Sequence, residues 1–198
     1  MATKRKPSPR LTHHERSLAL HADGGLRMVL VADTHSDPHP KSMQFIAARK
    51  PDVILHAGDI GDLAVLDQLA KIAPVIAVRG NIDERLTEHP DAITIDVRTH
   101  GEHGESALKI LLMHIAVYGP KIRADAALLA RQGGASLILC GHSHVPFLGR
   151  DRGLAVFNPG SIGPRRFLLP IVFGFIEIRE GKMSMEHVSC ETGERWMP

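Results

Sequence analysis

The sequence has few cysteines, no long apolar run and little net charge. Cys140 and Cys190 are the only two cysteines in 198 residues, too few for a disulfide framework. No apolar run approaches the roughly 18 residues of a membrane-spanning helix, and the first residues lack the apolar stretch of a secretory signal. A net charge of +2 is too small to indicate a nucleic-acid partner. These absences predict a cytoplasmic protein without a membrane segment.

The chain length predicts a single domain that follows a basic N-terminal arm. Residues 1–24 combine five lysines and arginines with proline and glycine, a composition that favours a flexible arm over a packed element. The alternative is that residues 17–20 add an edge strand or contact a neighbouring subunit. We expect the main domain at residues 25–190 and a C-terminal tail at residues 191–198.

Five short apolar runs in the sequence each lead into polar residues. The runs begin at Met28, Val53, Val75, Ile110 and Leu137. The polar residues that follow them are Asp33, His35, Asp59, Asn81, His114, His142 and His144. Such runs indicate buried strands, and open α/β sheets form their sites at the carboxyl ends of strands. We therefore expect these seven side chains to meet at one sheet edge.

The spacing between the runs predicts an α/β fold. Helices are expected from Pro40 to Pro51 and over 63–72, the latter with Asp62 as N-cap, so the first half forms parallel βαβ units. In the second half, the pattern predicts a hairpin of 93–98 with 108–113 and a helix over 121–131 that is closed by Gly133 and Gly134. Mostly antiparallel strands are expected at 137–139, 154–157, 171–178 and 183–187. Together the halves predict two facing sheets flanked by helices.

The seven polar side chains have the composition of a two-metal site. Hard ions prefer oxygen ligands, whereas Mn, Fe, Co and Zn also accept imidazole, so a mixed set favours the latter. Two ions about 3.5–4 Å apart need a shared oxygen ligand to offset their repulsion. Asp59, which follows Gly58 at a strand end, is the natural bridging carboxylate.

The ordered motifs resemble those of the calcineurin-like metallophosphoesterases, most closely the small bacterial and archaeal phosphodiesterase branch. The resemblance covers residues 27–188. Its motifs are Asp33-Thr34-His35, Gly58-Asp59, Gly80-Asn81-Ile82-Asp83, His114, Gly141-His142-Ser143-His144 and Asn158-Pro159-Gly160-Ser161. The fold that it implies is a four-layer α/β/β/α sandwich of two mixed β-sheets flanked by helices, in agreement with the two facing sheets.

The resemblance also implies the ligands, the cofactors and the chemistry. One divalent ion would take Asp33, His35, Asp59 and His144, and the other would take Asp59, Asn81, His114 and His142. Mn²⁺ is favoured, with Fe, Ni, Co or Zn as alternatives. A hydroxide held between the two ions would attack phosphorus, and the catalytic residues would be Asp59 and Asn81.

Two departures from the family pattern refine this expectation. Many members carry His after Gly-Asn, where it can protonate the leaving oxygen, but this chain has Ile82. The small phosphodiesterase branch often lacks that His as well, so Ile82 favours this branch. The family's His-Gly-His is here His114-Ile115-Ala116, which keeps the ligand and loses a neighbouring substrate contact. For substrate binding we name Asp83, which is equally suited to capping a turn, and Arg165, for which a structural salt bridge is equally expected.

The sequence thus predicts a binuclear-metal-dependent phosphodiesterase acting on a small phosphodiester. Two alternatives stay open: a phosphomonoesterase or nucleotide phosphohydrolase on the same site, and a non-catalytic scaffold of the kind that the family-related retromer subunit represents. The apolar Phe167-Leu168-Leu169 is suited to a homo-oligomer contact.

Overall fold

Two six-stranded mixed sheets face each other in the computed structural model, which describes residues 11–197. In spatial order, the β2 sheet contains β14 (Arg195–Trp196), β13 (Lys182–Ser189), β12 (Val172–Arg179), β2 (Leu26–Val31), β3 (Val53–His56) and β4 (Val75–Ala77). The β6 sheet contains β1 (His13–Ala19), β5 (Ala92–Arg98), β6 (Ser106–Met113), β9 (Leu137–Leu139), β11 (Leu154–Asn158) and β10 (Phe147–Asp151). The short strands β7 (Val117–Tyr118) and β8 (Lys121–Ile122) form a separate hairpin.

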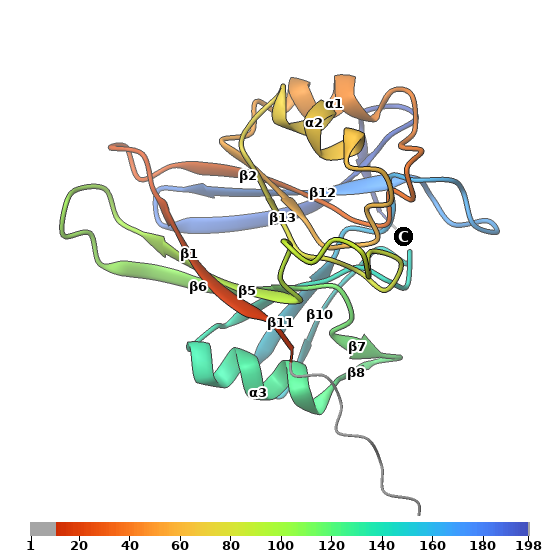
Figure 1. Cartoon of the computed structure of the whole chain (residues 1–198). Helices are drawn as coiled ribbons and strands as arrows, with labels where there is room; N and C mark the ends of the chain where they lie inside the picture. The colour runs from red at the N-terminus through yellow and green to blue at the C-terminus, as the bar shows by residue number, and fades with distance from the viewer. Residues whose placement is uncertain (1–10, 198) are drawn as a thin grey trace, which may run out of the picture.

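Helices cover the outer face of each sheet, which gives four layers (Figure 1). The helices α1 (Ser42–Ala48) and α2 (Ala64–Ala70) pack Ile46, Val65 and Leu69 onto the β2 sheet. The helix α3 (Ala124–Gly133) packs Ala126 and Ala130 onto the β6 sheet. None of these helices, and no other in residues 11–197, is long and apolar enough to cross a membrane. The predicted α/β/β/α sandwich of two mixed sheets is confirmed.

The main core lies between the two sheets, where both contribute apolar side chains. Met28 and Leu30 of β2 and Leu55 of β3 meet Ile110, Leu112 and Phe157 of the β6 sheet, all of them fully buried. Strands that are covered on both faces read as unbroken apolar runs, which is why β2 and β3 were recognisable in the sequence. The sheets therefore pack closely, with their polar strand ends at one margin.

Both predicted terminal segments contain strands. β1 pairs in parallel with β5 along His13 to Ala19, at the edge of the β6 sheet. The prediction of a flexible arm over 1–24 is therefore wrong for the described part, and the edge-strand alternative is the one observed; residues 1–10 lie outside the described residues. The predicted tail at 191–198 includes β14, which pairs with β13. In both segments, backbone hydrogen bonds to a neighbouring strand form the β-structure although most of the side chains are polar.

The second half is less antiparallel than its pattern suggested. β6 and β9 pair in parallel because α3 forms the crossover between them. β9 and β11 are also parallel, and β10 lies between them in sequence. α3 begins at Ala124, later than the predicted 121, since Gly119 at φ +55° and Pro120 form the turn of the β7–β8 hairpin. Its end is confirmed by Gly134, which caps the helix in the left-handed conformation.

The first half follows the prediction closely. β2, β3 and β4 are parallel neighbours, and α1 and α2 fall within the predicted helical segments. The N-cap of α2 is Leu63 and not the predicted Asp62, but Asp62 Oδ1 still accepts a hydrogen bond from the Ala64 N–H at 2.9 Å and so satisfies a free donor at the start of the helix. The hairpin of β5 and β6 is also confirmed. The strand ends that carry the predicted site are thus placed as expected.

Candidate metal centre

The structure brings all seven predicted ligands together from the carboxyl ends of strands in both sheets. The loops after β2, β3 and β4 supply Asp33, His35, Asp59 and Asn81, and those after β6 and β9 supply His114, His142 and His144. Because the two sheets face each other, loops that are distant in sequence meet across their shared margin. The seven side chains form two clusters.

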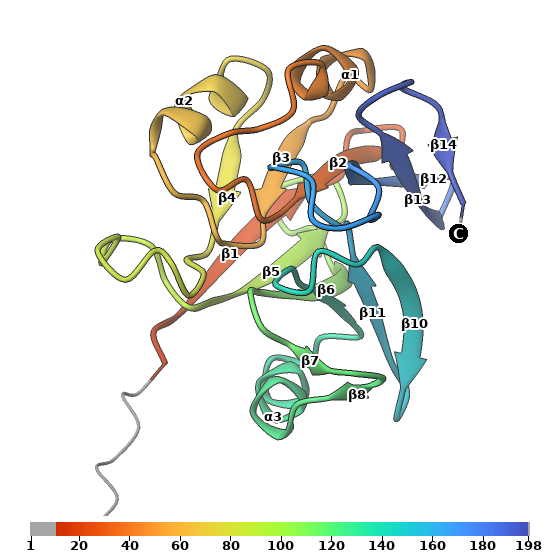
Figure 2. The ribbon, with the colours of Figure 1, turned by 90° about the vertical axis from the view of Figure 1, so that its right-hand side faces the viewer.

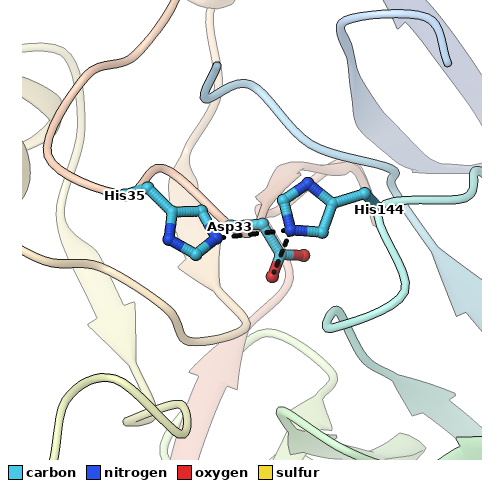
Figure 3. Close-up of side chains that lie close together, drawn as sticks. All are labelled: Asp33, His35 and His144. Atoms are coloured by element: carbon cyan, nitrogen blue, oxygen red, sulfur yellow. Dashed lines mark hydrogen bonds and ion pairs between the residues drawn. The ribbon is translucent and has the colours of Figure 1, made fainter. Parts of the chain in front are cut away.

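The first cluster contains Asp33, His35 and His144 (Figure 3). The Nε2 atoms of His35 and His144 lie 3.3 Å apart, and His144 Nε2 lies 3.5 Å from Asp33 Oδ1. Asp33 and His144 are buried, whereas His35 is partly exposed. Two imidazole nitrogens and a carboxylate oxygen therefore converge on one small volume that opens toward solvent beside His35.

The second cluster contains Asp59, His114 and His142, joined by the amide of Asn81. His114 Nε2 lies 3.2 Å from Asp59 Oδ1 and 3.1 Å from Asn81 Oδ1. The same amide oxygen lies 2.9 Å from His142 Nδ1. This cluster has the same mixture of oxygen and nitrogen donors as the first.

Asp59 connects the two clusters. Its Oδ1 faces His114 in the second cluster, and its Oδ2 lies 3.7 Å from His35 Nε2 in the first. A carboxylate with one oxygen toward each cluster has the arrangement needed for a ligand shared by two ions. The bridging role of Asp59 stays a prediction, and the positions of its two oxygens allow it.

The backbone is strained at five of the seven positions. Asp33, His35, Asp59, His142 and His144 all have positive φ, between 46° and 72°. Asp and His tolerate this region better than most residues, but it still costs energy, and such residues cluster at functional sites. The fold thus holds these side chains inward at the expense of local backbone stability.

One buried atom in the first cluster supports a cation site. Within residues 11–197, Asp33 Oδ1 is a buried side-chain atom without a hydrogen-bond partner, and it lies 3.5 Å from His144 Nε2. An unpartnered buried carboxylate oxygen is costly, and it faces imidazole nitrogens whose lone pairs converge on the same point. The donor set of both clusters suits a borderline divalent ion, so the residues present fit the pair of metal ions that the sequence predicted.

Charge and burial set the protonation of the ligands. Burial raises the pKa of Asp33 from 3.8 to about 7; the charge of His114 opposes this rise and that of Asp59 adds to it. Burial alone would raise the pKa of Asp59, but the hydrogen bond and charge of His114 and the Ile82 N–H bring it down to about 2. Burial, with the charge of Arg166, lowers the pKa of His144 to about 4. At neutral pH Asp59 is therefore ionised and His144 neutral, as metal ligation requires, whereas Asp33 is only partly ionised and would release its proton when an ion binds.

Residues behind the ligands fix their orientation. His114 Nδ1 lies 2.7 Å from the carbonyl oxygen of Ala57, so Nε2 is the nitrogen turned toward the cluster. His56, which the sequence places outside the ligand set, lies behind the ligands and is fully buried. Its ring bridges the Thr34 hydroxyl at 3.1 Å and the Gly58 N–H at 3.2 Å, which ties the β2 and β3 loops together.

Buried His56 predicts a pH dependence of stability. Burial lowers the pKa of His56 to about 3, while the unfolded chain takes up a proton near 6.5. The stability that neutral His56 confers is therefore complete above pH 6.5 and is lost progressively as the pH falls below it. Between pH 6.5 and 5 we expect the metal-free protein to lose about 2 kcal/mol from this residue. Urea unfolding at several pH values measures this loss in the free energy of unfolding. The variant His56→Gln, whose amide can still reach Thr34 and Gly58, should make the free energy of unfolding depend less on pH. An unchanged pH dependence in this variant would contradict the role given to His56.

Asp83 and Arg165, named from the sequence for substrate binding, are engaged elsewhere. Buried Asp83 accepts hydrogen bonds from the backbone N–H groups of Ile60, Gly61 and Gly80, so it holds two site loops in place. Arg165 pairs with Glu191 at 2.8 Å. Its neighbour Arg166, which the sequence reasoning did not select, places a guanidinium nitrogen 3.2 Å from His35 Nε2. Adjacent arginines carry no pattern that would have distinguished them.

Comparison with known proteins identifies the family. Residues 26–181 match the model of the calcineurin-like phosphoesterase superfamily domain. The chain belongs to this superfamily. Curated relatives of this superfamily member include a probable metallophosphoesterase of Methanocaldococcus jannaschii, 31% identical over 144 residues (70% of this chain and 69% of that protein). A second, from Methanothermobacter thermautotrophicus, is 29% identical over 136 residues (67% and 74%). The predicted family resemblance is confirmed.

Solved structures support the calcineurin-like fold. Vps29 of Entamoeba histolytica, in complex with Zn²⁺, superposes with a TM-score of 0.67 at 21% identity and covers 86% of this chain and 96% of its own. The E. coli phosphoesterase YfcE gives a TM-score of 0.52 at 18% identity with the same coverage. At these identities the likeness establishes the fold alone.

Proposed function

We propose that this calcineurin-like protein is a phosphodiesterase that works with two divalent ions, Mn²⁺ first among them. The observation that carries the proposal is the pair of mixed oxygen and nitrogen clusters joined through Asp59. Such ions would supply Lewis acidity toward the phosphoryl oxygens and lower the pKa of a water nucleophile. The chain's own contribution is to hold the seven donors close together, five of them on strained backbone, before any ion arrives. The family membership supports phosphoester hydrolysis, and the diester preference is our inference.

The preference for diesters follows from Ile82. Its side chain is exposed beside the centre, and its N–H donates to Asp59 Oδ1 at 3.2 Å, so the position supports Asp59 but offers no acidic proton. Monoesters of alcohols have poor leaving groups that benefit most from a general acid. A site without that acid is better suited to diesters whose leaving group departs readily.

Metal removal and replacement test the proposal. Protein stripped with a chelator should hydrolyse bis(p-nitrophenyl) phosphate at background rates, and added Mn²⁺ should raise the rate by at least about 100-fold, because several kcal/mol of charge stabilisation are restored. Fe, Ni, Co and Zn in parallel rank the alternatives. Hydrolysis of p-nitrophenyl phosphate, which has the same leaving group, should be slower.

The contrary outcomes separate the rival functions. A faster monoester reaction would favour the phosphomonoesterase or nucleotide phosphohydrolase. Absence of metal-dependent turnover together with absence of stoichiometric metal would favour a scaffold. All seven donor positions are filled by competent residue types, which favours the enzyme over the scaffold.

Arg166 is the residue best placed to bind a phosphoryl oxygen at the mouth of the first cluster. Its contact with His35 Nε2 uses the nitrogen that an ion would take, so loading of the site frees the guanidinium for the substrate. We expect Arg166→Ala to raise the KM for the diester about tenfold, the value of one charge-assisted hydrogen bond. Steady-state kinetics of Arg166→Ala and Arg165→Ala measure the difference; an equal or larger effect at Arg165 would assign the phosphate contact to the residue named from the sequence.

A further inference from the structure

An apolar pocket opens beside the second cluster, with a volume of about 680 Å³. The β7–β8 hairpin forms one wall, and β10 with β11 forms the other; Figure 2 shows the hairpin between α3 and β10. The pocket is lined among others by Tyr118, Val145, Phe147, Val156, Gly149 and His142. Volumes of this order are typical of sites for small organic molecules.

The walls of the pocket are held in place by contacts of their own. The Arg123 guanidinium lies 5.2 Å from the centre of the Tyr118 ring and pairs with Asp125 at 2.7 Å. Asp151 Oδ2 of β10 accepts the Ile122 N–H at 3.0 Å, which fastens the hairpin to the opposite wall. The pocket is therefore formed before any ligand binds.

Part of the apolar surface of the pocket is open to solvent. Val145 is 43% exposed and Tyr118 is 66% exposed, whereas Ile122 and Val156 at the base of the pocket belong to the core. The pocket is continuous with the metal centre because His142 lines it while its Nδ1 contacts Asn81. A phosphorus atom at the centre would thus have an apolar compartment within reach of one of its ester groups.

We propose that this pocket receives an aryl-sized apolar ester group of the substrate, an inference that rests on the proposed phosphodiesterase function. A diester has one group that leaves and one that stays on phosphorus, and the pocket selects for a flat, apolar group at one of these positions. Tyr118 and Phe147 supply aromatic surface to the walls, and such surface suits contact with an aromatic ester group. The substrate class is then a phosphodiester with at least one aromatic or comparably apolar ester.

Phosphinates test this without relying on turnover, because their P–C bonds cannot be hydrolysed. Calorimetry with Mn²⁺-loaded protein should show diphenylphosphinate binding about 10- to 50-fold more tightly than dimethylphosphinate, as expected for burial of an aromatic ring. Equal affinity for the two anions would overturn the proposal.

Gly149 allows the pocket to be filled selectively. A Cβ at this position would have only Phe147 Cδ2 nearby, at 3.9 Å, so a larger side chain extends into the pocket. Gly149→Leu should reduce the preference for diphenylphosphinate to less than about threefold and leave dimethylphosphinate binding unchanged, with Gly149→Ala between the two. Leu148→Ala, on the opposite face of β10, is the matched control and should retain the preference. Val145→Asn provides a second variant that adds polarity to the pocket without adding bulk, and it should also reduce the preference.

Hydrolysis and phosphinate binding can fail independently of each other. If Gly149→Leu abolishes the preference for diphenylphosphinate but the protein shows no metal-dependent hydrolysis, the pocket is a binding site and the phosphodiesterase function is rejected. If the protein shows metal-dependent hydrolysis but neither Gly149→Leu nor Val145→Asn alters the preference, the phosphodiesterase function stands and the pocket proposal is rejected. A second copy of the chain is the alternative occupant of the pocket, and sedimentation velocity tests for it. If the wild type self-associates and Gly149→Leu removes this association, the pocket is a contact between two copies and the proposal is overturned.

Discussion

Asp59→Asn is expected to lower the metal-dependent hydrolysis of a diester by at least about 100-fold, because the centre would lose the one charge that faces both clusters. Asn has nearly the same shape, and its amide oxygen can still accept the Ile82 N–H. Its neutral side chain cannot, however, offer an anionic oxygen to His114 on one side and to His35 on the other. The substitution therefore removes charge while leaving the backbone of the loop intact.

Two measurements follow the Asp59→Asn variant: the steady-state rate with saturating Mn²⁺ and the number of metal ions retained per chain. Wild-type protein should hold two ions and the variant fewer. Asp62→Asn is the control, since it makes the same chemical change three residues away, where the side chain only accepts the Ala64 N–H. Full activity of Asp59→Asn would reject the two-metal interpretation, and an equal loss in both variants would point to damage of the loop.

Gly80→Ala is expected to disrupt both the metal centre and the stability of the protein. A Cβ on Gly80 would overlap the backbone nitrogen and the side-chain Oδ1 of Asp59 and lie 2.9 Å from its Cα. The β3 and β4 loops must move apart to admit it, and Asp59 would leave its place between the clusters. Overpacking of this kind costs about 1–3 kcal/mol, so we expect the melting temperature to fall by about 5–10 °C and metal binding to be lost.

Gly149→Ala is the matched control for melting temperature and metal content. Both glycines lie outside the positive-φ region, so the change in backbone freedom is the same in the two variants. The added methyl on Gly149 meets only Phe147, at ordinary contact distance. Gly149→Ala should be as stable as the wild type or slightly more stable, as expected for Gly→Ala at a compatible conformation. A similar loss in both variants would show that the effect at Gly80 is not one of contact with Asp59.

The convergence of the seven candidate ligands was predictable from sequence because each of them follows an apolar strand. Strands such as β2 and β3, covered on both faces, appear as unbroken apolar runs, and the first polar residues after them can only lie at the margin of the sheet. Asp33 and Asp59 were therefore identifiable without knowledge of which strands are neighbours. The mixture of residue types then indicated the class of ion.

Features that depend on side-chain direction or on an edge strand were not predictable. Arg165 and Arg166 differ only in the way that a loop turns, and the loop directs the first to Glu191 and the second to His35. β1 carries charged and polar side chains because it lies at the edge of its sheet, so its pattern resembles that of a flexible segment. The pocket beside His142 arises from a hairpin whose two-residue strands are too short to leave a periodic signal.

Each of the two clusters takes donors from both halves of the sandwich. In the first, Asp33 and His35 come from one sheet and His144 from the other; the second likewise pairs Asp59 with His114 and His142. Bound ions would hold the two sheets together at this margin, since ligands that bind only the native state stabilise it by mass action. In a cell short of the ion, the chain would be inactive and would also unfold and be degraded more readily. Availability of the ion would then govern the abundance of the protein as well as its activity.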